Sequence, residues 1–79
     1  MLNAGFNNFV NEDRILAFAD YRKRTAPITR AIHEAEDVGK VIDFTCGHKT
    51  NTVIFLDTGH IVLSFKLPET IDNNLRKSA

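Results

Sequence analysis

The residues whose side chains could best react or bind in this sequence lie in one polar segment, from Cys46 to Asn51. Cys46 and His48 stand two positions apart, a spacing that could serve a metal ion or pair a nucleophile with a base. A structural zinc site needs a second such pair, and the remaining histidines, His33 and His60, fall in separate predicted elements. A Cys–His nucleophile also needs an oxyanion site and a third residue to orient the base, and no motif supplies them. The sequence therefore predicts no metal site and no catalytic pair.

Other residues that could act on a substrate are equally isolated. The carboxylates Asp43, Asp57 and Glu69 have no spacing that favours paired acid–base catalysis. Gly47 is a lone glycine, and no glycine-rich phosphate loop is present. We therefore expect a protein that is not an enzyme, holds no cofactor and takes no small-molecule substrate.

A different chemistry is open to the loop from residue 47 to residue 51. It contains only small, polar or basic residues and lies between two apolar runs. Lys49, the amide and hydroxyl of Thr50, and His48 could contact a polyanion such as double-stranded DNA. Arg30, on the polar side of a predicted helix, could join that surface. The alternative is an ordinary solvated loop.

The charges are balanced overall, with ten Lys and Arg residues against ten Asp and Glu residues. A basic surface must therefore come from local segregation of cations. One further cluster, the three consecutive cations beside Tyr21, is either a solvated loop or a second phosphate contact. Its residues are Arg22, Lys23 and Arg24.

Length and composition indicate one globular domain over residues 1–79. The hydrophobic fraction of 43% and the charged fraction of 25% are ordinary for a folded domain. A single cysteine excludes an intrachain disulfide and fits a reducing compartment. No apolar run approaches the ~18 residues that span a bilayer, and the N-terminus lacks the features of a signal peptide. We expect a cytoplasmic protein that does not contact a membrane.

The stretch from Val41 to Leu67 organises the predicted fold. Three runs rich in β-branched and aromatic residues, at 41–45, 52–57 and 60–65, are separated by turn residues and predict an antiparallel meander. Thr58-Gly59 predicts a tight turn with a positive φ at the glycine. The last two runs are nearly continuously apolar, which predicts burial on both faces, with Ile54 and Val62 in the core. Because one small helix cannot cover both faces, we expect a second subunit to do so.

The remaining elements complete an α+β fold with about five to six short strands, one main helix and a short C-terminal helix. Short strands are expected near residues 6–10 and 14–19. The main helix should begin at Pro27, end before a left-handed Gly39, and bury one stripe of residues. That stripe consists of Ile28, Ala31, Ile32 and Ala35. The second helix should run from Pro68 to Leu75, followed by a frayed basic tail.

An ordered series of landmarks over nearly the full length resembles the RemA family, bacterial regulators of extracellular-matrix (biofilm) genes. The landmarks are Gly5-Phe6-x-Asn8, Arg14-Ile15, Ala26-Pro27-Ile28-x-Arg30, Glu34-Ala35, Gly39, Ile42-Asp43-x-Thr45-x-Gly47, Thr50, Asp57, His60, Leu63-Ser64 and Pro68-Glu69-Thr70. The resemblance implies a DNA-binding transcriptional regulator that presents a basic loop. It also implies a ring-shaped homo-oligomer, with an octamer as the candidate size.

The resemblance also assigns residues to the DNA contact. The family's arginine pair after the loop glycine corresponds to His48 and Lys49, and the arginine before its first long strand corresponds to Arg14. The helix arginine is Arg30, whereas the basic residue before it is replaced by Thr29. A protein–protein assembly module without DNA binding is the alternative that zero net charge and the missing arginine pair leave open.

Overall fold

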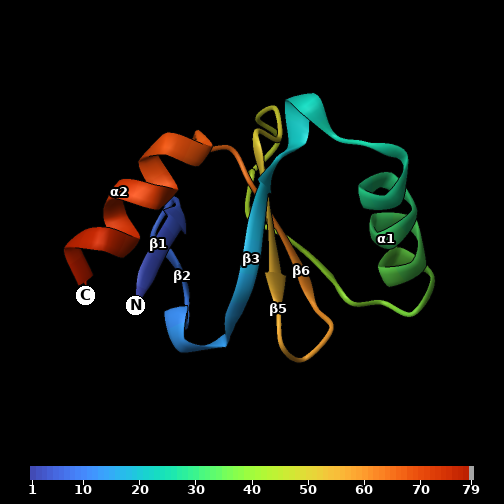
Figure 1. Ribbon diagram of the computed structural model, residues 1–79, viewed down its shortest axis with the longest axis horizontal. Helices are drawn as coiled ribbons and strands as arrows, with labels where there is room; N and C mark the ends of the chain where they lie inside the picture. Colours follow the sequence, from blue (N-terminus) through green and yellow to red (C-terminus); the bar gives the residue numbers. More distant parts are fainter. Residues whose placement is uncertain (79) are drawn as a thin grey trace.

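The two apolar runs that follow residue 51 form adjacent strands at the centre of a four-stranded sheet (Figure 1). The computed structural model describes residues 1–78. Its strands are β1 (Leu2–Gly5), β2 (Asn8–Val10), β3 (Ile15–Asp20), β4 (Val41–Asp43), β5 (Thr52–Leu56) and β6 (Ile61–Ser64). Its helices are α1 (Ala26–Asp37) and α2 (Pro68–Ser78), with single 3-10 turns at Glu12–Arg14 and Tyr21–Lys23. The predicted α+β class is confirmed.

The position of β4 differs from the predicted meander. The sheet order is β3-β5-β6-β4, and β4 pairs in parallel with β6, where Ile42 lies opposite Val62. The prediction of a hairpin between β4 and β5 is therefore wrong. Eight residues separate Asp43 from Thr52, more than the two to five, roughly, of a typical hairpin loop. This connection instead carries the chain past β6, so that both central strands have a partner on each side.

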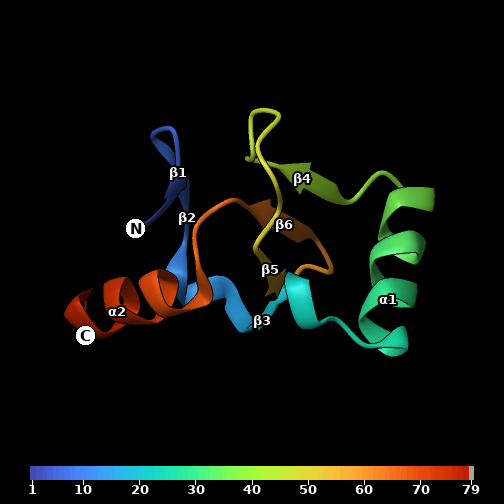
Figure 2. The same ribbon diagram turned by 90° about the horizontal axis from the view of Figure 1, so that it is seen from above.

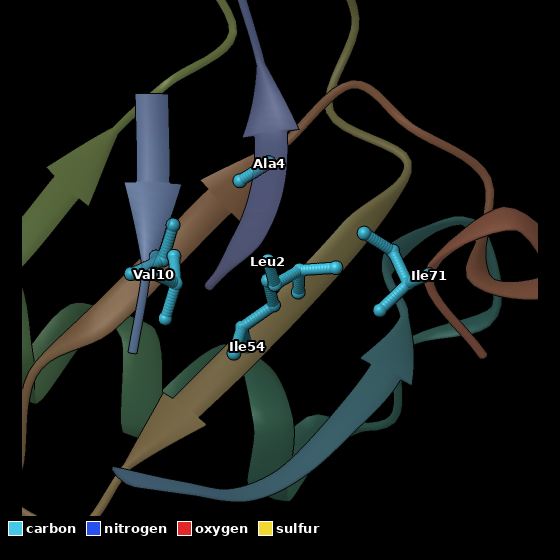
Figure 3. Close-up of a cluster of buried hydrophobic side chains, with 6 residues drawn as sticks. Leu2, Ala4, Val10, Ile54 and Ile71 are labelled. Atoms are coloured by element: carbon cyan, nitrogen blue, oxygen red, sulfur yellow. The ribbon is translucent and has the colours of Figure 1, made fainter. Parts of the chain in front are cut away.

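One face of the sheet is covered by the N-terminal hairpin and α2. The hairpin pairs β1 with β2, and α2 lies against β1 and β3 (Figure 1). Figure 3 shows the apolar cluster between these layers, in which Leu2, Ile54 and Ile71 are almost fully buried. Val62, the other predicted core residue, belongs to the same cluster.

The opposite face packs against α1, on the other side of the sheet in Figure 1. The predicted apolar stripe is confirmed: Ile32 and Ala35 are buried against Val53 and Ile61. Both faces of the central strands are thus covered within one chain. The expectation that a second subunit must cover one face is wrong, because β1, β2 and α2 do so.

The helix boundaries follow local capping chemistry. α1 begins at Ala26, one residue before the predicted start, and its first turn is closed by a hydrogen bond from the Thr29 N–H to the Thr25 carbonyl at 3.1 Å. At its end, the Lys40 N–H donates to Ala35 and the Gly39 N–H donates to the Glu36 carbonyl. Gly39 has a φ of 72°, the left-handed conformation expected of a residue past a helix end.

α2 is longer than predicted and continues through the basic residues 76 and 77 to Ser78. Arg76 forms an ion pair at 3.0 Å with Asp72, one turn earlier. Cations near a helix C-terminus also interact favourably with the helix dipole. The prediction that residues 76–78 form a frayed tail is therefore wrong, and Ala79 lies outside the described residues.

A buried contact fixes the N-terminal hairpin to the sheet. The Ser64 hydroxyl donates to the Ala4 carbonyl at 2.7 Å, and both residues are buried. The next residue, Gly5, has a φ of 127°, and a Cβ at this position would lie 2.3 Å from Cε1 of Phe65. Only glycine lets the hairpin approach the chain after β6 this closely.

We expect Gly5→Ala to lower the free energy of unfolding by about 3 kcal/mol, since it combines a strained φ with overpacking against Phe65. Gly39→Ala is the matched control because its φ is also positive but no atom lies within 4 Å of the added Cβ. That control should lose only about 1 kcal/mol. Urea unfolding measures both, and equal losses would mean that Phe65 moves aside without cost.

Candidate nucleic-acid interface

The polar loop between β4 and β5 reverses direction in a tight turn at Thr45–His48. The His48 N–H donates to the Thr45 carbonyl at 2.9 Å, and the two central residues, Cys46 and Gly47, have φ values of 51° and 85°. Positive φ at both central positions is the type I′ arrangement. The turn pushes residues 46–49 outward, and all four are exposed.

Asp43 anchors the start of this loop. Its carboxylate accepts the Thr45 N–H at 2.8 Å and also the Thr45 hydroxyl. These two bonds, the hydroxyl bond first, hold the pKa of Asp43 below its usual value. The charged form stabilises the loop, so this contribution is present at neutral pH and is lost only as the pH falls through that lowered pKa.

Asn51 anchors the far end of the loop. Its N–H donates to the Ser64 carbonyl at 2.9 Å, and its side-chain amide donates to the Phe65 carbonyl at 2.6 Å. Its own carbonyl accepts the Tyr21 N–H at 2.9 Å. The loop is therefore fixed at both ends, while its middle projects from the sheet (Figure 2).

The predicted contact residues within the loop are positioned differently. His48 and Lys49 are exposed, whereas Thr50 is half-buried. Within residues 1–78, the Lys49 side chain forms no ion pair and no hydrogen bond. Lys49 is thus a free cation in the exposed middle of a loop that is anchored at both ends, and Thr50 is the next residue.

Three rings form a cluster around His48, the residue that precedes Lys49. The centroids of Phe6 and His48 are 5.3 Å apart, those of Phe6 and Phe65 4.9 Å, and those of His48 and Phe65 5.7 Å. Phe6 lies at the tip of the β1–β2 hairpin, so two distant parts of the chain meet at this surface. The sequence analysis did not assign Phe6 or Phe65 to the site. The two asparagines that follow Phe6, Asn7 and Asn8, are turn-forming residues and were the available signal.

Arg14 does not join this surface within one chain. It precedes β3, and its guanidinium forms an ion pair at 3.2 Å with Asp57, which follows β5. Lys49 precedes β5, so the two cations lie near opposite ends of that strand, which is five residues long and about 16 Å in length.

The second basic cluster is largely occupied by contacts of its own. Arg22 donates twice to the Asp20 carboxylate, at 2.9 Å each, which lowers the pKa of Asp20 and raises that of Arg22. Arg24 lies over the ring of Tyr21, 4.1 Å from its centroid, and donates to the Tyr21 carbonyl. Lys23 is exposed and forms no ion pair within residues 1–78. Of the three, Lys23 is the cation most available to a partner.

Arg30 is exposed on α1, which stands apart from the polar loop in both views of the fold (Figures 1 and 2). Glu34 follows one turn later on the same side of the helix. The chain alone therefore does not bring Arg30 next to Lys49.

An open apolar groove of about 360 Å³ lies between α1 and the β3 side of the sheet. Leu16 of β3 and Val38 after α1 line it, and they are 72% and 67% exposed. Ala31, Phe55 and His60 are among its other lining residues, and the lining also includes Glu34 of α1. The buried residues of α1, Ile32 and Ala35, pack on the central strands at Val53 and Ile61, whereas Leu16 of the edge strand β3 stays exposed.

Other binding chemistries find little support in the described part of the chain. Within residues 1–78, no group of three or more His, Cys, Asp and Glu side chains could hold a metal ion. Cys46 is a free, exposed thiol. No helix in the same range is long and apolar enough to cross a membrane.

Comparison with known proteins places these features in a family. The sequence profile described as extracellular matrix regulatory protein A-like matches residues 1–75. A protein of Synechococcus elongatus is 44% identical over 78 residues, covering 99% of this chain and 87% of the relative. A protein of Lachnoclostridium phytofermentans is 42% identical over 77 residues, covering 98% and 82%. By name alone, both relatives are regulatory proteins. The chain belongs to the RemA-like family.

Proposed function

We propose that this protein is a non-enzymatic transcriptional regulator that binds double-stranded DNA as a homo-oligomer. Membership of a family named for extracellular-matrix regulation supports control of matrix (biofilm) genes as its role. The observation that carries the proposal is the free cation Lys49 in the exposed middle of a loop anchored through Asp43 and Asn51. An anchored loop loses less conformational freedom when it binds, so more of the contact energy remains as affinity.

The loop suits phosphate contacts better than base recognition. Lys49 provides a compact charge, and the Thr50 hydroxyl and His48 can donate to phosphate oxygens. Lysine lacks the planar fork of arginine, which binds a guanine edge through two hydrogen bonds. The proposed binding therefore depends steeply on salt and discriminates weakly between base sequences.

A single chain offers few free cations to DNA, so the proposal includes self-assembly. Repeating the loop around a ring, with an octamer as the candidate size, would convert weak contacts into avidity. Assembly would also bring more cations, Arg14 and Arg30 among them, along one DNA path. Lys23 could add a secondary contact beside Arg22 and Arg24.

The apolar groove beside α1 is the proposed assembly face, with a second copy of the chain as its occupant. Leu16 and Val38 are large, exposed and adjacent to an unpaired edge of the sheet, β3. Exposed apolar surface and a free strand edge both favour association with another chain. A head-to-tail contact through such a groove can close into a ring.

The alternative function is a protein–protein assembly module without DNA binding. The pairing of Arg14 with Asp57 and of Arg22 with Asp20 favours it, because these cations are already neutralised in a chain of zero net charge. Recovery of a specific protein partner, with no duplex bound at low salt, would support this alternative against the proposal.

Removal of the Lys49 charge tests the proposed DNA contact. Lys49→Ala should weaken binding to a mixed-sequence duplex by about fivefold for each copy engaged, and lower the salt slope by about one per copy. Fluorescence anisotropy at about 50 and 200 mM salt measures both quantities. Arg30→Ala should also lose affinity while keeping its oligomeric state. Lys77→Ala, exposed on α2, is the matched control and should bind normally.

Charged substitutions in the groove test the proposed assembly face. Leu16→Asp and Val38→Asp should each lower the mass measured by light scattering towards that of the 8.9 kDa chain, because a buried unpaired carboxylate is costly at an interface. Leu67→Asp, exposed but outside the groove, should leave the mass unchanged. A wild-type protein that is monomeric at micromolar concentration would rule out the ring.

A further inference from the structure

The tip of the β1–β2 hairpin places an aromatic residue where a smaller one would be easier to accommodate. Phe6 and Asn7 have φ values of 52° and 59°, so both adopt the left-handed conformation of a type I′ turn. Asparagine and glycine tolerate this conformation, whereas a bulky side chain does so at a cost. Residues held in costly conformations are concentrated at functional sites.

The fold holds the Phe6 ring in place but does not bury it. The ring packs on Phe65 and beside His48, yet Phe6 remains 50% exposed. The hairpin beneath it is fixed by the buried bond from Ser64 to Ala4. The ring contacts His48, which precedes the free Lys49 in the loop. A fixed, half-exposed ring and a nearby cation are two features of surfaces that bind single-stranded nucleic acid, a stacking platform and a charge.

We infer that Phe6 is a stacking contact for an unpaired or unstacked base, while Lys49 holds the adjoining phosphate. This inference rests on the proposed DNA binding and adds the form of DNA that is preferred. In a fully paired duplex the faces of the bases are covered, and an inserted ring must first open a base step. DNA with unpaired bases avoids that cost, so it binds more tightly. Every base has a face on which a ring can stack, so the contact requires no particular sequence.

The test compares two labelled ligands, a fully paired duplex and the same duplex with a short mismatched segment at its centre. Wild-type protein should bind the mismatched duplex more tightly. Phe6→Leu and Phe6→Ala should each lose about tenfold in affinity for the mismatched duplex, with a smaller loss for the paired one. The salt slope should be unchanged, since the phosphate contacts remain.

Phe9→Leu is the matched control because Phe9 lies on the same hairpin, is 52% exposed and lies outside the ring cluster. It should keep both the affinity and the preference for mismatched DNA. Circular dichroism and light scattering on each variant verify that the fold and the assembly are intact.

The possible failures are distinguishable. Salt-sensitive duplex binding that Phe6→Leu and Phe6→Ala both leave intact would overturn the stacking contact but not the proposed function. Loss in Phe6→Ala with full retention in Phe6→Leu would mean that the ring only supports the loop, which also overturns the contact. Wild-type protein that binds neither ligand at low salt would overturn both proposals.

Discussion

The central strands β5 and β6 are apolar on both sides, and the rest of the fold follows from the need to cover both faces of them. On one face, α1 supplies Ile32 and Ala35. On the other, β1, β2 and α2 supply Leu2, Val10 and Ile71 (Figure 3). Each buried aliphatic side chain contributes about 1.5–3 kcal/mol relative to exposure. A domain of this length therefore uses nearly every element it has as a layer of the core.

The same covering layer builds the proposed binding surface. Because the hairpin must bury Leu2 and Ala4 against the sheet, its tip is carried to the loop that leaves β4. The close approach at Gly5 and the hydrogen bond from Ser64 fix this position. The ring cluster of Phe6, His48 and Phe65 is thus a consequence of core packing. A substitution in the hairpin would therefore alter the position of the loop even though it removes no charged side chain.

Local patterns in the sequence predict local structure well in this chain. The helical stripe around Ile32, the left-handed Gly39 and the core positions Ile54 and Val62 are all confirmed. The partner of β4 was predicted wrongly, since residue type does not say which of two apolar strands an edge strand will join. The contact of Phe6 with His48 could not be predicted either, because it depends on how the hairpin docks. Pairing of Arg14 with Asp57, 43 positions away, depends in the same way on the register of β3 against β5.

The pairing of cations bears directly on how such a protein could bind DNA. Lys49 is free, but an exposed ionic contact contributes only up to about 1 kcal/mol, which alone would leave binding far too weak to regulate a gene. Repetition around an assembly adds these small terms, because after the first contact the others form at a high effective concentration. Repetition also multiplies any loss of contact free energy in the loop. In the proposed assembly, a loop that offers His48 and Lys49 and no arginine would make the same weak contact in every copy. Aromatic contacts, which do not depend on charge, would then contribute a larger share of the affinity.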